Sequence, residues 1–346
     1  MPEFLSRQRW WITRVLLLPL HLFVFAIITF LLLRLVPGDP VASVLGPNYT
    51  QAAYLTMQRA LGLDGSVWSQ LGRYIVEILH LDFGSSIQTG RAVMSEMGTR
   101  LPGTLELAVQ GLFFTVLLSL VLSYVAVFHP KTVLARIVLV YSRAAGALPE
   151  FVLAVWALFV FFTVLHVAPA PLGRLSTDLP TQTVITGFPF LDTLIQGYTA
   201  GAISMAAHLV LPIAVMAIAS SAVVIKVLVS SLQGAIQDPA TAFRITTGSG
   251  RRATVLSVYR RAAPAVVTLV GQMFGYLVGG TIVLESLFGF AGLGSYAVKA
   301  VLSTDYPAIQ GFLLVVAGIT LIVYMIVDLA VMTVDPRRRP GSVGSN

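Results

Sequence analysis

The sequence predicts an all-α polytopic membrane protein with six transmembrane helices, a helical cap on the external side and a short helix on the cytoplasmic side. Of its 346 residues, 56% are hydrophobic and 11% are charged, whereas a soluble domain carries about 25% charged residues. So few charges cannot cover the surface of a water-soluble fold. Six apolar runs are long enough to cross about 30 Å of hydrocarbon. They are residues 15–33, 105–128, 137–167, 208–232, 263–284 and 308–334.

The first apolar run follows a basic N-terminal segment that contains Arg7, Arg9 and Arg14. The apolar core of a cleavable signal peptide spans about 7 to 15 residues and is followed by a small-residue cleavage site. Because the run at 15–33 is longer and lacks such a site, we expect it to remain as the first span. A charge and two prolines in residues 34–40 predict the end of this helix.

Charge is distributed unevenly between the segments that connect the runs. The N-terminus, residues 129–136, residues 226–262 and the C-terminal tail together hold 14 basic and 3 acidic residues, whereas the other connecting segments hold 7 basic and 8 acidic. Basic residues gather on the cytoplasmic side of membrane proteins, so we expect both termini in the cytoplasm. The orientation of the chain in the membrane also explains its net charge of +7. A nucleic acid is not expected as a partner, because the sequence lacks aromatic stacking platforms and Lys/Arg-rich tracts.

Two connecting segments are longer than a turn requires, which indicates structure or function. Residues 38–100 include amphipathic stretches and predict the external cap, and residues 234–262 form a polar, basic, glycine-punctuated cytoplasmic loop. The chain accordingly divides into four parts. These are a cytoplasmic N-terminus with the first span (1–36), the external cap (37–103), a five-helix core that contains the loop 234–262 (104–334) and a cytoplasmic tail (335–346).

The cytoplasmic loop is predicted to contain a short helix that begins after Asp238 and ends at Gly248. An aspartate side chain accepts hydrogen bonds from the first free amides of a helix, and proline is favoured at the first position, where Pro239 stands. Glycine adopts the left-handed conformation that ends a helix. A second short helix at 253–261 is expected to lead into the membrane at Pro264.

This loop resembles the cytoplasmic coupling loop of ABC-importer permeases, whose short helix sits in a groove of an ATPase subunit. The family pattern is Glu-Ala-Ala, three residues and glycine, and it aligns with Ala242, Phe243, Arg244 and Gly248, with Pro264 as the later proline. The spacing, the glycine and the proline match, whereas alanine replaces the glutamate.

Further motifs resemble the dipeptide/oligopeptide permease family of the DppB/OppB type. Residues 35–40 read Leu-Val-Pro-Gly-Asp-Pro, and residues 100–108 read Arg-Leu-Pro-Gly-Thr-Leu-Glu-Leu-Ala. Toward the C-terminus, Glu285 is followed by Gly-Leu-Gly at 292–294 and Asp-Tyr-Pro at 305–307. Resemblance in this order over most of the chain implies the type I, MetI-like permease fold of a bacterial inner-membrane importer.

That resemblance implies a subunit of an ATP-driven peptide importer, with a second permease, two ATPase subunits and an extracytoplasmic solute-binding protein as partners. ATP and magnesium would be bound by the ATPase subunits, since this chain has no phosphate loop of the form GxxxxGK[ST]. We therefore expect a transport subunit without catalytic residues or a cofactor of its own. The implied coupling residues are Asp238, Pro239, Thr241, Ala242, Phe243, Arg244 and Gly248.

Ionisable residues within the apolar runs are candidates for a gate or pathway, since a charge in a membrane costs about 2.5 to 3.5 kcal/mol. Arg143 and Glu150 are seven residues apart, which predicts that they share one helix face, and Pro149 between them predicts a kink or break. The alternative is a polar helix start near the interface. Glu285 is expected either to anchor a loop or gate, or to be exposed at the interface. Glu106 is expected in the first turn of the second span, where the helix dipole stabilises an anion.

Three glycines, Gly271, Gly275 and Gly279, recur every four residues in the fifth run. Small residues at this spacing allow two helix backbones to approach closely in lipid. We expect such packing against another span of this chain or against the partner permease, with a role in the pathway as the alternative.

The resemblance also assigns an external loop to contact with the binding protein. Its residues are Phe288, Gly292, Gly294, Asp305 and Tyr306. No metal site is expected, because the chain has no cysteine and no pair of its five histidines has metal-ligand spacing.

Two other classes of protein remain as alternatives. An ion-coupled secondary transporter uses intramembrane charges and usually shows inverted repeats, and the two halves of this chain show no convincing repeat. An intramembrane enzyme needs a motif such as HExxH or GxSxG, and neither occurs. Within the ABC class, a nickel complex or glutathione is the alternative to a peptide substrate.

Overall fold

The computed structural model describes residues 2–35, 38–143 and 149–334, which form helices joined by loops. The predicted tail at 335–346 lies outside the described residues. In chain order the helices are α1 (Pro2–Leu35), α2 (Pro40–Leu45), α3 (Gln51–Ala60), α4 (Val67–Leu79), α5 (Val93–Phe128), α6 (Val133–Arg143), α7 (Glu150–Ala157), the π-helical segment η1 (Leu158–Val164), α8 (Pro189–Ile195), α9 (Thr199–Gln237), α10 (Pro239–Thr246), α11 (Arg251–Leu287), α12 (Leu293–Leu302) and α13 (Tyr306–Val334).

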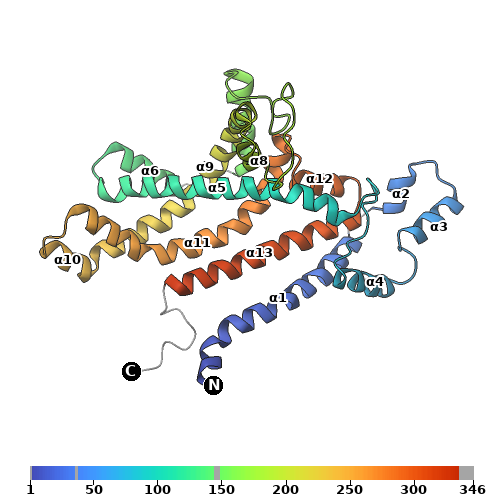
Figure 1. The fold of residues 1–346 in the computed structure, drawn as a ribbon, viewed down its shortest axis with the longest axis horizontal. Helices are drawn as coiled ribbons and strands as arrows, with labels where there is room; N and C mark the ends of the chain where they lie inside the picture. The colour runs from blue at the N-terminus through green and yellow to red at the C-terminus, as the bar shows by residue number, and fades with distance from the viewer. Residues whose placement is uncertain (1, 36–37, 144–148, 335–346) are drawn as a thin grey trace.

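Five of the described helices are long and apolar enough to cross a membrane, namely α1 over Val15–Leu35, α5, α9, α11 and α13 over Tyr306–Leu329. α5 packs along α9, α11 contacts α5, α9 and α13, and α1 packs against α13 (Figure 1). Apolar side chains such as Leu16, Phe113 and Ile203 are exposed along these helices, as surfaces that face lipid require. The predicted all-α polytopic class is confirmed.

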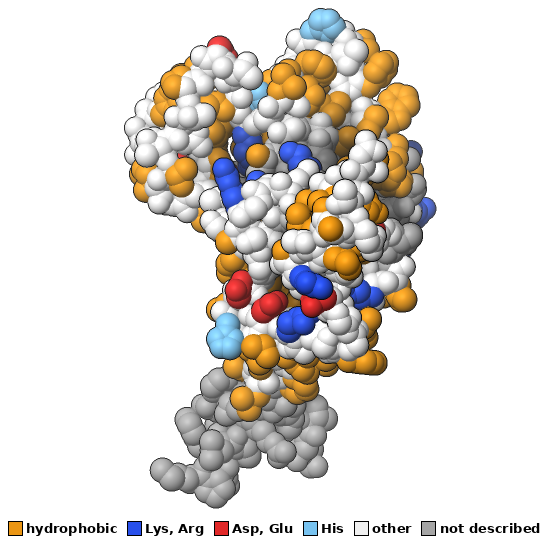
Figure 2. Space-filling view, turned by 90° about the vertical axis from the view of Figure 1, so that its right-hand side faces the viewer, with side chains coloured by type: hydrophobic (Ala, Val, Ile, Leu, Met, Phe, Trp, Pro, Cys, Tyr) orange, Lys and Arg blue, Asp and Glu red, His pale blue; other side chains and the backbone are white. Residues whose placement is uncertain are grey.

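The bundle has two distinct ends. α10, the turn between α5 and α6 and the start of α1 lie toward one end, which we call the α10 end (Figure 1). α2, α3, α4 and α12 lie at the opposite end, which we call the cap end (Figure 1). Viewed toward the cap end, basic and acidic side chains gather close together among hydrophobic ones, and basic side chains are visible in a hollow between two lobes (Figure 2).

The third predicted span, 137–167, is not one continuous helix. α6 ends at Arg143, and α7 begins at Glu150 after Pro149, whose backbone is extended. Proline lacks an amide donor and disfavours the helical conformation in the residue before it, so the predicted break is confirmed. Because Arg143 and Glu150 belong to different helices, the prediction that they share one helix face is wrong.

Two long helices begin outside the runs predicted from hydropathy. α5 begins at Val93, so Glu106 lies within the helix and not in its first turn, and that prediction is wrong. α11 begins at Arg251 and continues through Pro264, so no separate helix forms at 253–261. Hydropathy marks the part of a helix that lipid covers, whereas polar turns extend the helix beyond it. A proline in a membrane helix is tolerated where neighbouring groups satisfy the backbone that it frees.

The cap consists of the three helices α2, α3 and α4, so the prediction that residues 38–100 form a helical cap is confirmed. Asp39 begins α2 because its Oδ1 accepts hydrogen bonds from the amides of Val41 and Ala42, at 2.9 and 3.2 Å. The Tyr54 hydroxyl on α3 donates to Asp39 Oδ2 at 2.8 Å. Asp39 therefore starts one cap helix and attaches the next.

The core positions the two helices that flank α10. Near the α10 end, Leu228 and Leu232 of α9 pack against Val258 and Ala262 of α11, and all four are buried. Further along, Leu107 of α5, Met216 of α9 and Leu277 of α11 are fully buried together. α9 and α11 thus form one packed unit along the bundle.

Candidate functional site

α10 forms the short helix predicted from the sequence. Asp238 Oδ1 accepts a hydrogen bond from the Ala240 amide at 2.8 Å, and Pro239 is the first helical residue. At the other end Gly248 has a φ of 79°, and its amide donates to the Ile245 carbonyl at 3.1 Å. The predicted start and end of this helix are confirmed.

One side chain of α10 attaches it to both neighbouring spans. Thr241 is 2% exposed. Its hydroxyl donates to the Ala235 carbonyl of α9 at 2.7 Å and accepts from Arg261 Nη1 of α11 at 3.0 Å. The same Nη1 atom lies 3.3 Å from Asp238 Oδ1. Thr241 is thus bonded to both α9 and α11.

The other side chains of α10 point away from the bundle. Phe243 is 68% exposed, and Ala242, Arg244 and Ile245 are exposed beside it. Phe243 and Ile245 are the large apolar side chains that α10 exposes. Of the predicted coupling residues, Thr241 holds the helix in place, and the exposed ones are available to a partner.

A buried charge cluster lies beside α12, and sequence reasoning did not find it. Arg174, in the loop after η1, places Nη1 3.6 Å from Glu106 Oε2 and donates from Nη2 to the Gly103 carbonyl at 2.9 Å. Burial lowers the pKa of the Arg174 guanidinium, and the carboxylates of Glu285 and Glu106 oppose that shift. In the sequence, Arg174 is a single charge in a predicted external loop. The fold brings it close to Glu106 and Gly103.

Glu106 is stabilised by a helix start, but not by its own. Its Oε1 accepts hydrogen bonds from the amides of Phe190 and Leu191, both at 3.0 Å, in the first turn of α8. Free amides and the helix dipole favour an anion at this position. The predicted stabilisation of the Glu106 carboxylate by a helix N-terminus therefore occurs at the start of α8. It does not occur at the start of α5, which lies 13 residues earlier at Val93.

Glu285 anchors the segment that follows α11. Its side chain is 0% exposed. One carboxylate oxygen accepts from the Thr104 hydroxyl at 2.7 Å and the other from the Gly294 amide at 2.7 Å. The alternative that Glu285 is exposed at the interface is wrong, because these bonds hold it beneath the start of α12.

The residues predicted to face a binding protein are buried. They are Phe288, Gly292, Gly294, Asp305 and Tyr306. Asp305 Oδ2 accepts from the Ser86 hydroxyl at 2.6 Å, which joins the loop before α5 to the start of α13. Their burial shows that these residues shape the loop and do not offer side chains at its surface, while the position of the loop toward a binding protein stays a prediction. Leu302 on the neighbouring α12 is exposed.

Of the other gate or pathway candidates, Glu150 is buried and Arg143 is exposed. A Cβ on Gly280 of α11 would lie 2.9 Å from Glu150 Oε2, so the glycine leaves room for the carboxylate. Among the described residues, neither oxygen of Glu150 has a hydrogen-bond partner. Pro149 therefore sets the start of α7, and Glu150 places a carboxylate between α7 and α11.

Two of the three predicted packing glycines face α13. A Cβ on Gly271 would overlap the Val327 side chain, and a Cβ on Gly275 would lie 2.7 Å from the Tyr324 hydroxyl. Nothing lies within 4 Å of a Cβ on Gly279. Each step of four residues turns about 40° around a helix, so the third glycine leaves the shared face. Close packing against α13 is confirmed for Gly271 and Gly275, whereas Gly279 packs against no described side chain of this chain, and its packing against a partner permease stays a prediction.

The described residues enclose three large hollows. Two are apolar grooves of about 620 and 660 Å³, the first bordered by α5, α9, α11 and α13 and the second mainly by α5 and α9. The third is a polar cavity of about 420 Å³ beneath the cap. Within this part of the chain, no group of three or more His, Asp or Glu side chains has an arrangement that could hold a metal ion.

The fold defines a class of protein, namely a multi-pass membrane protein in which a short capped helix, α10, is exposed between two long apolar helices. Residues 111–340 match the family model described as binding-protein-dependent transport system inner membrane component. Residues 7–108 match the model of the N-terminal part of the same kind of component. The chain belongs to the family of binding-protein-dependent transport system inner membrane components.

Similar proteins match almost the whole chain. It is 30% identical over 312 residues to the probable D,D-dipeptide transport system permease protein DdpB of Escherichia coli (strain K12), covering 90% of this chain and 92% of that protein. It is 29% identical over 327 residues to the dipeptide transport system permease protein DppB of Alkalihalophilus pseudofirmus, covering 94% and 97%. It is 28% identical over 317 residues to the di/tripeptide transport system permease protein DppB of Pseudomonas aeruginosa, covering 90% and 93%. The family resemblance of the motifs is confirmed.

Proposed function

We propose that this chain is a permease subunit of an ATP-driven importer for dipeptides or oligopeptides and that it forms the translocation pathway with a second permease. The observation that carries this proposal is α10, a capped and exposed helix attached to two spans through Thr241. A transporter driven by an ion gradient does not need a helix presented to a soluble motor. The names of the relatives, which concern dipeptide and di/tripeptide transport, support the substrate class.

The coupling step runs through residues 238–248. Two ATPase subunits, which bind ATP and magnesium, close on each other and displace α10. Because the Arg261 guanidinium contacts both Thr241 and Asp238, α11 moves with α10, and the bond from Thr241 to the Ala235 carbonyl takes α9 with it. The pathway between the two permeases then opens to alternate sides. This chain supplies the movement of the pathway and its partners supply the energy.

The proposed orientation follows from where the charges lie in the fold. Arg244 lies on α10 and Arg251, Arg252, Arg260 and Arg261 lie on the first turns of α11, all at the α10 end. This end faces the cytoplasm by the positive-inside rule. The cap end then faces outward, where a solute-binding protein delivers the peptide, and both termini are cytoplasmic in a bacterial inner membrane.

A substitution on the exposed face of α10 tests this function. We expect Phe243→Asp to lower ATP-dependent uptake of a labelled dipeptide by about tenfold in proteoliposomes that contain the whole complex, because a buried interface anchor is lost. The amount of assembled chain should not change, since Phe243 takes no part in the core. Leu79→Asp, at a position on α4 that is 72% exposed, is the matched control and should transport normally. Unchanged uptake by Phe243→Asp would contradict the proposal.

A second measurement separates this proposal from an ion-coupled transporter. The purified chain alone, placed in liposomes under a proton or sodium gradient, should take up no dipeptide and hydrolyse no ATP. With the whole complex, unlabelled dipeptide should compete with the labelled one, whereas glutathione and nickel complexes should not. Gradient-driven uptake by the isolated chain would overturn the division of labour, and competition by glutathione or nickel would overturn the substrate class.

A further inference from the structure

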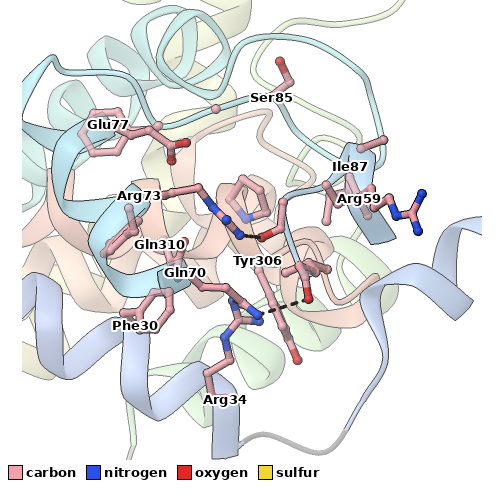
Figure 3. A pocket seen from close by; sticks show the side chains of 18 residues that line it. Phe30, Arg34, Arg59, Gln70, Arg73, Glu77, Ser85, Ile87, Tyr306 and Gln310 are labelled. Carbon is pink, nitrogen blue, oxygen red and sulfur yellow. Dashed lines mark hydrogen bonds between the residues drawn. The ribbon is translucent and has the colours of Figure 1, made fainter. Parts of the chain in front are cut away.

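The cavity beneath the cap is not used by the proposed function. Its volume of about 420 Å³ lies in the range of sites for small molecules. The outer end of α1, helices α3 and α4 and the first turn of α13 surround it (Figure 3). Its lining contains three arginines, Arg34, Arg59 and Arg73, and one carboxylate, Glu77. Arg34 and Arg73 reach inward, while the Arg59 guanidinium lies at the rim and turns away (Figure 3).

Arg34 is held in place but lacks a counter-charge. Its Cζ atom lies 4.9 Å from the ring centre of Phe30 and 5.5 Å from that of Tyr306. One amino group donates to Gln70 Oε1, and the Gln70 amide is itself held by the Leu63 carbonyl at 3.1 Å. Arg34 Nε is buried without a hydrogen-bond partner, and among the described residues no carboxylate forms an ion pair with this guanidinium. Because Arg34 is half-buried and a charge withdrawn from water is normally paired, its guanidinium is a candidate ligand for an anion.

A second unused donor lines the same cavity. Tyr74 on α4 is 7% exposed, and its hydroxyl is buried without a hydrogen-bond partner. Its ring centre lies 5.3 Å from that of Phe30, whose ring also contacts Arg34. Buried hydroxyl groups are normally hydrogen-bonded. Among the described residues, the Arg34 Nε on α1 and the Tyr74 hydroxyl on α4 thus both lack an acceptor, and both side chains contact the Phe30 ring.

We propose that this cavity binds an oxyanion, the carboxylate or phosphate group of a small solute or of a lipid headgroup, with Arg34 as its main ligand and Tyr74 as a second donor. A guanidinium matches the planar pair of oxygens of such a group. Arg73 is held by the Gly62 and Asp64 carbonyls at 2.6 and 3.0 Å and is paired with the Asp64 carboxylate at 3.4 Å. Because the Arg59 guanidinium turns away, Arg34 is the inward-reaching arginine of this lining that has no ion pair among the described residues, and it is the group that favours an anion.

Two sources of the anion are compatible with the position of the cavity. Arg34 lies at the end of a membrane-spanning helix, where lipid headgroups begin, and the polar cap loops on the other side are open to solutes. The chemistry at Arg34 is the same for both. The inference does not depend on the proposed function, because neither α10 nor a transported peptide enters it.

The test measures thermal unfolding of the full-length chain with its co-purified subunits in a maltoside detergent, which carries no phosphate or carboxylate group. In one arm inorganic phosphate or acetate is titrated against chloride at constant ionic strength. In the other arm phosphatidylglycerol is added to the micelles. We expect a rise in Tm in at least one arm, because a ligand that binds only the folded state stabilises it. The arm that responds identifies the source.

Three variants show whether the effect arises in the cavity. Tyr74→Phe removes one hydroxyl that has no partner, so the fold is retained, and we expect the apparent Kd of the anion to rise about fivefold. Arg34→Gln should raise it about tenfold or more. Arg91→Gln, an exposed arginine of the cap end outside the cavity lining, is the matched control and should behave like the wild type.

Two outcomes would overturn the proposal. The first is no rise in Tm in either arm, which would show that water satisfies Arg34 and Tyr74. The second is an unchanged Kd in Tyr74→Phe together with equal losses in Arg34→Gln and Arg91→Gln, which would show that the anion binds through diffuse positive charge. If Arg34→Gln fails to assemble, the comparison of Tyr74→Phe with Arg91→Gln decides the question.

Discussion

At the scale of single residues, buried charges hold the cap end of the bundle together. Arg174 lies 3.6 Å from Glu106, and Glu106 also accepts amides at the start of α8. Glu285 binds Thr104 and Gly294. These contacts join α5, α8, α11 and α12, so one unpaired charge among them would weaken several attachments at once.

The first prediction concerns the pair formed by Glu106 and Arg174. We expect Glu106→Gln to destabilise the fold by about 3 kcal/mol, because Arg174 then keeps a buried charge without its partner. Adding Arg174→Met should recover part of the lost stability. The double variant should therefore be less destabilised than the sum of the two single variants by about 1 kcal/mol or more. The free energy of unfolding of each variant, measured in the same detergent, gives this difference. Glu77→Gln, at an exposed carboxylate, is the control, and strict additivity would show that the pair is not coupled.

At the scale of elements, close approach of helices depends on individual glycines. The backbone of α11 lies against α13 at Gly271 and Gly275, while Gly279 has open space beside it. The spacing in the sequence suggests that all three glycines pack closely against another helix. In the structure only Gly271 and Gly275 pack against α13, because each step of four residues turns the helix by more than one full turn.

The second prediction compares two of these glycines. Gly271→Ala should destabilise the chain by about 1 to 3 kcal/mol, because the added methyl group overlaps Val327 and forces α11 and α13 apart. Gly279→Ala introduces the same change of residue on the same helix and should cost little or nothing. Thermal unfolding of both variants in one detergent gives the comparison. Equal losses at the two positions would show that helix propensity, and not packing against α13, sets the effect.

At the scale of the whole molecule, the arrangement of the helices separates two functional ends. α10 with its basic neighbours lies at one end, and the cap helices with α12 lie at the other (Figure 1). The natural chain contains no cysteine, so single cysteines report the side of the membrane on which each end lies.

The third prediction concerns orientation. Gln51→Cys on α3 and Gln237→Cys at the end of α9 are both at exposed positions. In intact spheroplasts a membrane-impermeant maleimide should label Gln51→Cys and leave Gln237→Cys unlabelled, because the basic α10 end faces the cytoplasm. Both variants should react after lysis, which is the control. Labelling of Gln237→Cys in sealed cells would reverse the orientation and remove α10 from the reach of an ATPase.

Local chemistry made much of this protein predictable from its sequence alone. Apolar runs identified the spans, and Pro149 identified the break in the third. Asp238, Pro239 and Gly248 bounded α10 correctly because caps and left-handed ends depend on a few neighbouring residues. The motifs around these features also pointed to the family that the comparisons confirmed.

Only the tertiary structure decided which distant groups meet. The hydroxyl of Thr241 reaches a guanidinium 20 residues away, Arg174 pairs with a glutamate 68 residues before it, and Asp305 binds a serine 219 residues before it. The same packing buries the loop residues expected to face a partner and leaves Arg34 without an ion pair among the described residues. Sequence patterns determine hydropathy and capping within a few turns, whereas pairing across the chain depends on how whole helices pack, and that arrangement is a property of the folded bundle.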